Sequence, residues 1–207
     1  MTRFIFIAVL LFSTSGWAQN YVQLNDVTVC KERINSHANK TTTIAANFSE
    51  EIFSSMLKST SKAKGILRYK KENKIRWEHL SPKKQIILIN GKLMKYSENG
   101  KEIKNAGSNR VVKKVQGLMI QMFNGDFLDE KEFSIMYFEN SLNYKLVLLP
   151  KNSRMSNYIE SIELIFDKNT LAMKNLTLKE TEEDKIVYTF TSIVFNKEIT
   201  NTTFTQF

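Results

Sequence analysis

The chain has 207 residues and carries 30 Lys and Arg against 21 Asp and Glu, a formal net charge of +9. That length suits one domain, and the lysines are scattered rather than gathered into the basic runs typical of nucleic-acid-binding segments. We therefore expect no nucleic-acid partner. We interpret the positive charge first as a solvated surface and second as an aid to contact with an anionic membrane surface.

The first residues have the three-part layout of a secretory signal. A short basic start at Arg3 precedes an apolar run over 4–12, and small residues lead to Ala18. The apolar run is too short to cross a bilayer. We predict a signal peptide over 1–18, cleavage after Ala18, and a single domain over 19–207. The alternative is a buried N-terminal strand.

Two segments have the spacing of amphipathic helices. Residues 22–39 place Leu24, Val27, Cys30 and Ile34 on one stripe. Cys30 is the only cysteine, so we interpret it as a small apolar residue on that face. Residues 110–123 predict a second helix, whose apolar side carries Val111, Val115, Leu118, Met119, Met122 and Phe123. Spacing alone favours an ordinary core helix, although two methionines make its apolar side adaptable.

The rest of the chain predicts short antiparallel strands. The apolar residues Ile44, Ala46, Phe48, Ile52 and Met56 alternate along 41–56. Asn-Gly pairs at 90–91 and 99–100 predict hairpin turns, because Asn and Gly tolerate a positive φ. Between 65 and 78 one face carries Leu67, Tyr69, Ile75 and Trp77, and the other carries Arg68, Lys70, Arg76 and Glu78. We expect one apolar and one wet face.

Four or five further strands follow between 133 and 195, so we predict one antiparallel sheet of about ten strands with two or more helices. A sheet that long must curl. The helical stripes then cover its apolar concave side and leave a pocket for an apolar ligand. The residues that we expect to line this pocket are Phe48, Leu67, Tyr69, Ile75, Trp77, Ile87, Tyr96, Leu118, Met119, Met122 and Phe123.

No catalytic or metal-binding pattern is present in the sequence. His37 and His79 are the only histidines, and neither has a Cys, Asp or Glu at metal-ligand spacing. There is no nucleophile elbow and no phosphate loop. His79 shares the inward parity of Trp77, but a structural role is the simpler interpretation. We expect a binding protein rather than an enzyme, with no metal and no cofactor.

A series of short segments resembles the periplasmic outer-membrane lipoprotein carrier proteins, the LolA-like family. The segments, in family order and spacing, are Ala46-Asn47-Phe48-Ser49-Glu50, Gly65-Ile66-Leu67, Ile75-Arg76-Trp77-Glu78, Ser81-Pro82, Asn90-Gly91-Lys92, Tyr96, Tyr144 to Pro150, and 162–167. The resemblance implies a mainly β fold with an α lid: an unclosed, strongly curved antiparallel half-barrel covered by helices.

The resemblance also implies a function and partners. The family takes acylated lipoproteins from an inner-membrane lipoprotein-releasing ABC transporter and carries them through the periplasm, as a monomer, to an outer-membrane acceptor. The acyl chains occupy the cavity. Two alternatives remain open: a carrier or sensor for another amphiphile such as a glycolipid, and an envelope enzyme with an acyl substrate. An enzyme would need a polar cluster that faces inward.

The chain departs from the family pattern after its Gly-x-Leu strand, where the family carries Arg-Pro or Lys-Pro. Here Lys71 and Glu72 stand at those positions. In the family that arginine holds the lid shut through hydrogen bonds to lid carbonyls. Lys71 is therefore a candidate lid gate, weaker because lysine lacks the planar fork of arginine. A plain exposed turn lysine is the alternative. The sequence up to Phe207 also lacks the usual family tail.

Overall fold

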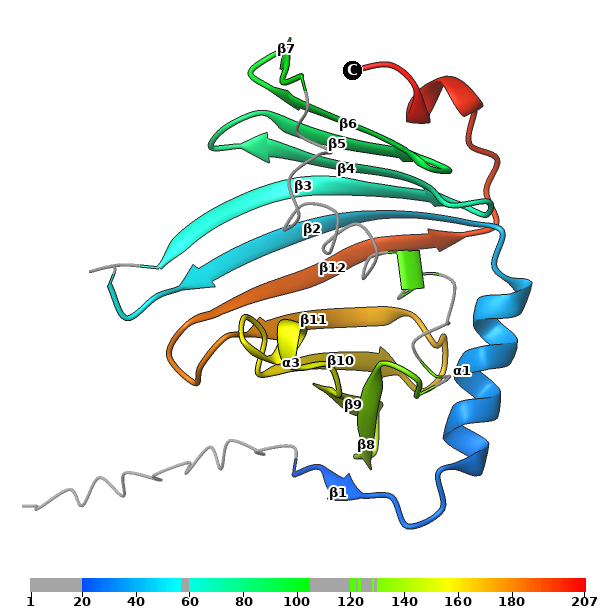
Figure 1. Cartoon of the computed structure of the whole chain (residues 1–207). Coiled ribbons are helices and arrows are strands. Elements are labelled where there is room, and N and C mark those ends of the chain that lie inside the picture. Colours follow the sequence, from blue (N-terminus) through cyan, green and yellow to red (C-terminus); the bar gives the residue numbers. More distant parts are fainter. Residues whose placement is uncertain (1–19, 57–59, 105–119, 122, 124–127, 129) are drawn as a thin grey trace, which may run out of the picture.

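The computed structural model describes residues 20–56, 60–104, 120–121, 123, 128 and 130–207. Within them, twelve strands form one antiparallel sheet in the order β1-β8-β9-β10-β11-β12-β2-β3-β4-β5-β6-β7. Strands β1 and β7 are its two edges, so the sheet curves without closing (Figure 1). The predicted unclosed half-barrel is confirmed, with twelve strands rather than about ten.

The strands are short, and most follow one another through hairpins. They span Val22–Gln23 (β1), Thr43–Phe53 (β2), Ser61–Lys70 (β3), Lys74–Ser81 (β4), Gln85–Asn90 (β5), Leu93–Glu98 (β6), Lys101–Glu102 (β7), Phe133–Glu139 (β8), Asn143–Pro150 (β9), Ser161–Asp167 (β10), Met173–Lys179 (β11) and Lys185–Phe195 (β12). Among the described residues, helices span Thr28–Lys40 (α1), Ser153–Ser156 (α3) and the short 3-10 segment Asn201–Phe204 (η3), and residues 120–121 and 123 are also helical. No described helix has the length and apolar character needed to span a membrane.

Three of the four turns between β3 and β7 contain residues with positive φ. Asn99 and Gly100 have φ of 48° and 78°, as the sequence predicted, and Gly91 has a φ of 61°. The β3–β4 turn contains Glu72 and Asn73 with φ of 71° and 59°. Proline is fixed near −65°. Because Glu72 has a left-handed backbone, this turn excludes the proline that the family carries there.

Helix α1 begins later than predicted. Residues 22–23 form strand β1, which pairs with β8, and the Leu24 N–H donates to the Tyr137 carbonyl. The prediction of a helix from residue 22 is therefore wrong, because these backbone groups are used by the edge of the sheet. The predicted apolar stripe is nevertheless present, since Cys30 and Ile34 are buried and Leu24 and Val27 pack against the core.

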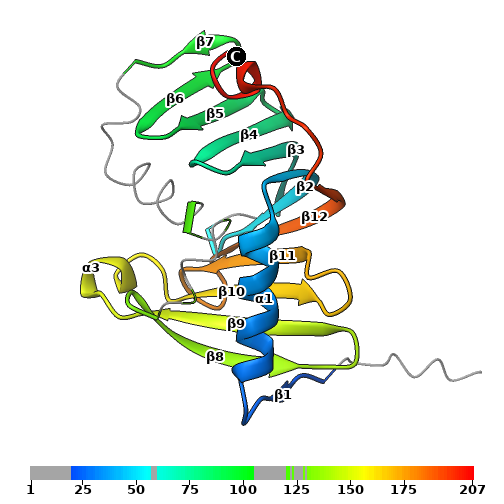
Figure 2. The same ribbon diagram turned by 90° about the vertical axis from the view of Figure 1, so that its right-hand side faces the viewer.

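Figures 1 and 2 show α1 running across the ends of β8 to β11. Arg33 fixes it there: one guanidinium nitrogen donates to the Tyr144 hydroxyl at 3.0 Å, and another donates to the Lys168 carbonyl at 2.6 Å. Those groups lie on β9 and in the β10–β11 turn, so a single side chain connects α1 to both. The helix thereby covers one end of the concave face.

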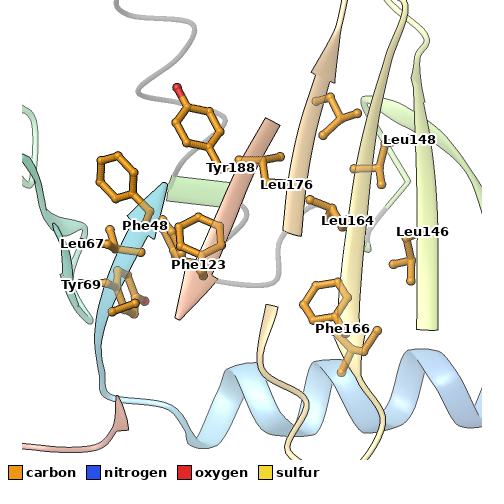
Figure 3. Close-up of a cluster of buried hydrophobic side chains, with 14 of the residues drawn as sticks. Phe48, Leu67, Tyr69, Phe123, Leu146, Leu148, Leu164, Phe166, Leu176 and Tyr188 are labelled. Atoms are coloured by element: carbon orange, nitrogen blue, oxygen red, sulfur yellow. The ribbon is translucent and has the colours of Figure 1, made fainter. Parts of the chain in front are cut away.

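The concave face carries most of the core. Cross-strand pairing aligns Ala46, Leu67, Trp77, Ile87 and Tyr96 in one row. The next row contains Ile44, Tyr69, Ile75, Ile89 and Met94. Figure 3 shows the side chains of Phe48, Leu67, Tyr69 and Phe123 gathered over this face, with Leu146, Leu164 and Leu176 continuing it on β9 to β11. The predicted alternation is confirmed here, except at Met56, which lies beyond the end of β2 and is 92% exposed.

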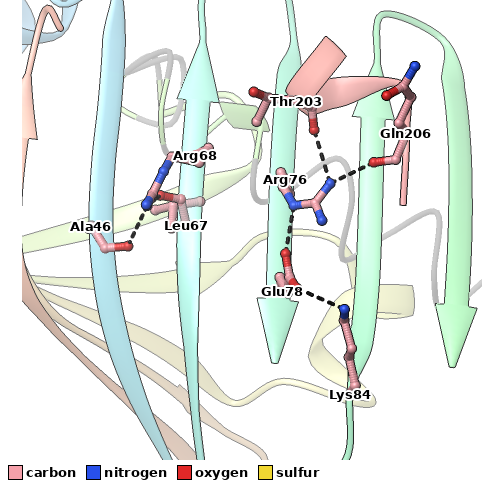
Figure 4. A network of polar contacts seen from close by, with 8 residues as sticks. All are labelled: Ala46, Leu67, Arg68, Arg76, Glu78, Lys84, Thr203 and Gln206. Atoms are coloured by element: carbon pink, nitrogen blue, oxygen red, sulfur yellow. Dashed lines mark hydrogen bonds and ion pairs between the residues drawn. The ribbon is translucent and has the colours of Figure 1, made fainter. Parts of the chain in front are cut away.

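The outer face of β3 to β5 is not the wet surface that the sequence predicted. Ile86 and Leu88 point outward yet are each only 2% exposed, and Glu78, which pairs with Ile86, is also buried. The short helix η3 packs against β4 and β5 and buries its own Phe204. Arg76 donates to the carbonyls of Thr203 and Gln206 (Figure 4). The C-terminal segment therefore covers this part of the sheet.

Candidate functional site

An apolar cavity lies on the concave face beneath the C-terminal half of α1. Its volume is about 50 Å³. That is room for a few water molecules and well below the roughly 300–1,000 Å³ of pockets that enclose small organic ligands. The lining residues are Ile34, His37, Ala38, Thr41, Ile44, Ala46, Leu67, Phe123, Phe166, Leu171, Met173, Phe190, Ile193 and Phe195.

Strands β2 and β3 contribute Ile44, Ala46 and Leu67 to the cavity by the ordinary alternation of side chains. Two β-bulges, in β12 and β11, place other lining residues. In β12 the pairing with β2 shifts between Thr191 and Val194. Phe190 pairs with Phe48 and Phe195 with Ile44, so these two aromatic residues, five apart, face the same side. An extra residue in one strand reverses the alternation beyond it. The bulge thus brings Phe195 into the cavity.

The second bulge affects β11 in the same way. Leu164 pairs with Leu176, but after a register shift Phe166 pairs with Met173. Met173 therefore reaches the concave side although it is three residues from Leu176 and out of phase with it. Period-two reasoning missed Phe195, Ile193 and Met173 for this reason. On α1, Ile34 belongs to the predicted apolar stripe, whereas Ala38 does not, and neither had been predicted as a cavity residue.

Among the described residues that line the cavity, His37 and Thr41 are polar. The Thr41 hydroxyl donates to the His37 carbonyl at 2.8 Å, closing the end of α1. The ring of His37 meets Phe195 edge to face, with 4.7 Å between ring centroids. Its Nε2 atom is buried and has no hydrogen-bond partner among the described residues. Burial lowers the pKa of His37, so its ring is neutral at neutral pH.

Beside the cavity the concave face is filled by aromatic rings. Phe48 stacks on Trp77 with centroids 4.5 Å apart, and Tyr188 and Phe190 meet Trp77 edge to face. Phe48 lies directly over Gly65, where an added Cβ would be 2.3 Å from the Phe48 ring and 2.2 Å from the Glu78 carbonyl oxygen. Gly65 is therefore the residue that lets this ring lie flat. These four aromatic residues, Phe48, Trp77, Tyr188 and Phe190, form an aromatic block on the concave face beside the cavity.

A small polar cluster follows this block on the same face. Glu50 accepts a hydrogen bond from His79 at 3.0 Å and another from the Tyr188 hydroxyl. Burial alone would raise the pKa of Glu50, but these two bonds, together with the electrostatic attraction of His79, outweigh it and hold the pKa below its usual value. Glu50 thus connects the other two side chains, His79 and Tyr188. No group of three or more metal-ligating side chains is close enough to bind a metal among the residues that the structure describes.

The predicted cavity residues occupy different parts of this site. Leu67 and Phe123 line the cavity. Phe48, Tyr69, Ile75 and Trp77 are buried in the same concave core, and Ile87 and Tyr96 lie further along it, partly buried. Phe123 packs on Tyr69 with centroids 5.5 Å apart. Leu118, Met119 and Met122, with most of the predicted second helix, lie outside the described residues.

Lys71 lies just after β3, at the end of α1. Its Nζ donates to the carbonyl of Asn39 in the last turn of that helix. Lys70, its neighbour, points the other way and donates to the Ile199 carbonyl and to Asn201 Oδ1 of the C-terminal segment. The two adjacent lysines thus connect opposite faces of the sheet to different elements, and only Lys71 contacts the helix over the cavity.

Comparison with known proteins shows which families and structures this chain resembles. The family model for the outer membrane lipoprotein carrier protein LolA matches residues 39–206. A LolA superfamily protein from Nitrosomonas europaea has a similar structure, with 10% identity, a TM-score of 0.46, and coverage of 85% of this chain and 97% of that one. The MucA/MucB complex of Pseudomonas aeruginosa gives 13% identity, a TM-score of 0.45, and coverage of 86% and 60%. No curated protein matched in sequence.

A third solved structure, the lipoprotein LppX of Mycobacterium tuberculosis, gives 8% identity and a TM-score of 0.42, with coverage of 86% of this chain and 99% of that one. These structural likenesses are distant. The family model, in contrast, spans every strand from β2 to β12 together with η3. The open antiparallel half-barrel, the helix across its concave face and the matched residues together place this chain in the LolA family of outer membrane lipoprotein carrier proteins.

Proposed function

We propose that this protein is a periplasmic carrier that holds the acyl chains of lipoproteins in the cavity beneath α1. The observation that carries the proposal is an apolar cavity on the concave face of an open half-barrel, with walls almost free of polar groups. Each buried methylene contributes about 0.8 kcal/mol, so roughly ten contribute about 8 kcal/mol before ordering costs. That is enough to hold a lipid chain away from water.

The cavity must widen before it accepts an acyl chain, because about 50 Å³ is too small. The walls that can separate are α1 and Phe123 on one side and the sheet on the other. Lys71 and Arg33 hold α1 against the sheet through its Asn39 carbonyl and through Tyr144 and Lys168. We infer that these bonds favour the closed form, and that cargo binding competes with them.

The proposed route follows from the family. A signal peptide cleaved after Ala18 exports the chain, and an inner-membrane lipoprotein-releasing ABC transporter loads it. An outer-membrane acceptor unloads it. Glu50, His79 and Tyr188 form a hydrogen-bonded polar cluster on the concave face beyond the cavity. It contains no serine, threonine or cysteine, and Glu50 accepts hydrogen bonds from both of its partners, which fits a structural role better than the centre of an envelope enzyme.

Mass spectrometry of material that co-purifies with the protein from its own periplasm tests this function. We expect acylated lipoproteins to be enriched over a mock purification. Enrichment of a glycolipid or another free lipid, without lipoproteins, would instead establish the carrier or sensor for another amphiphile.

A charged cavity variant gives a direct test in vitro. Met173→Glu places a carboxylate in the apolar cavity wall, which is costly without a partner. We expect at least tenfold weaker binding of the fluorescent probe 11-(dansylamino)undecanoic acid. Met136→Glu is the matched control, because Met136 lies at the exposed surface of β8. Equal binding by both variants would move the lipid site away from this cavity.

A further inference from the structure

His37 is the one cavity-lining side chain whose polar atom is left without a described partner. Thr41, the other polar lining residue, already donates its hydroxyl to the His37 carbonyl. The Nε2 atom of His37 is buried and has no hydrogen bond among the described residues. A buried, unpaired polar atom costs free energy, and natural proteins keep few of them. Its presence in an apolar wall therefore points to a partner that arrives with the ligand.

The surroundings of His37 define the kind of group that would pair with it. The ring is held edge-on to Phe195, at 4.7 Å between centroids. Burial lowers its pKa, so it presents a neutral imidazole with one N–H and one lone pair. Around it the wall consists of apolar residues, among them Ile34, Ala38 and Ile44. Such a place suits a single neutral hydrogen-bonding group at the end of a hydrocarbon chain.

We propose that His37 recognises the carbonyl oxygen of the ester or amide linkage that joins an acyl chain to its cargo. In the tautomer with the proton on Nε2, the imidazole donates to that oxygen. The chain itself then extends over Ala46 and Leu67 toward Phe123, where the described lining residues are apolar. This inference rests on the proposed function and adds the chemical group that fixes the ligand in the cavity.

A matched pair of lipids isolates the carbonyl. The ester 1-monopalmitoylglycerol and the ether 1-O-hexadecylglycerol share a glycerol head and a 16-carbon chain, but only the ester has a carbonyl oxygen. Their affinities are compared by displacement of 11-(dansylamino)undecanoic acid from the mature chain. A typical net hydrogen bond predicts about a fivefold preference of the wild type for the ester. His37→Phe and His37→Leu remove the donor and should bring the ratio close to one.

Two further variants show that the effect belongs to this atom. His37→Gln keeps a hydrogen-bond donor and should retain part of the preference for the ester. Ser36→Phe adds an aromatic ring at the preceding, exposed position of α1 and should leave the ratio unchanged. The ligand-free His37→Phe protein should also have a Tm no lower than that of the wild type, because no unpaired nitrogen is buried in it.

The outcomes separate this inference from the function on which it rests. Equal affinity of the wild type for both glycerolipids would overturn the role of His37 while leaving the cavity as the lipid site. An ester preference that persists in both His37→Phe and His37→Leu would do the same. If the wild type binds neither glycerolipid nor the fluorescent probe, the proposed function and this inference both fail.

Discussion

At the scale of single residues, the cavity end of α1 is controlled by three side chains with different tasks. Arg33 and Lys71 attach the helix to the sheet and to the β3–β4 turn, and His37 faces the cavity. The same helix carries the buried apolar residues Cys30 and Ile34. The same two turns of helix therefore close the cavity and present its polar contact.

Cys30 allows a direct check of how firmly α1 is packed. Burial, with a smaller contribution from Glu139, raises the pKa of its thiol to about 11. At pH 8 we expect negligible alkylation by iodoacetamide in the folded protein and rapid alkylation in 6 M guanidinium chloride, because only the thiolate is reactive. Mass spectrometry of the intact protein measures this. Fast alkylation without denaturant would mean that α1 separates readily from the sheet.

At the scale of elements, the contact between the β3–β4 turn and α1 is the candidate gate. Lys71→Leu removes the hydrogen bond to the Asn39 carbonyl and weakens the closed form. Because the closed form competes with cargo, we expect the variant to bind cargo about five- to tenfold more tightly, from the typical worth of one hydrogen bond. It should also release cargo more slowly to an acceptor in a reconstituted transfer assay.

The control for this experiment must be chosen with care. Lys70→Leu is unsuitable, since Lys70 binds the C-terminal segment through Ile199 and Asn201. Lys92→Leu is better matched, because Lys92 is an exposed lysine in the β5–β6 turn. If Lys71→Leu and Lys92→Leu release cargo at the wild-type rate, Lys71 is only a surface residue of its turn.

The C-terminal segment is a second element with a testable structural role. Phe204 is 1% exposed in η3, which packs against β4 and β5. Phe204→Ala removes a buried aromatic ring and should lower the free energy of unfolding by about 3–5 kcal/mol. Urea denaturation followed by tryptophan fluorescence measures the change, with Phe207→Ala at an exposed position as the control. A loss below about 1 kcal/mol would show that the segment is not needed to cover the sheet.

At the scale of the whole molecule, cargo binding should loosen the packing of α1 and leave strands β3 and β4 unchanged. The strands β2 to β5 are joined by continuous pairing, whereas α1 meets the sheet through side chains. On adding 1-monopalmitoylglycerol, we expect amide hydrogen exchange to change most in α1 and little in β3 and β4. Mass spectrometry of peptides from both regions tests this. Equal protection of α1 with and without lipid would contradict opening at the helix.

Much of the architecture could be predicted from the sequence because its signals are local. Alternation along Leu67, Tyr69, Ile75 and Trp77 depends only on the pleat of a strand, and the turn at Asn99-Gly100 only on backbone sterics. These residues lie where they were expected, in the concave core and in a hairpin. A single-face apolar pattern over so many strands requires a curled sheet with a cover, and the family motifs agree with this.

The cavity itself was decided by tertiary structure. Bulges in β11 and β12 bring Met173 and Phe195 to the concave side, against the side that simple alternation predicts. The local sequence pattern did not predict these bulges. Residues 22–23 joined β8 instead of a helix because an edge strand far along the chain offered hydrogen bonds. The outer face of β4 and β5 became buried because η3 folds back on it. The sequence by itself determined which residues are apolar and how they alternate; long-range packing determined which of them enclose space, because a cavity depends on segments that meet only in the folded chain.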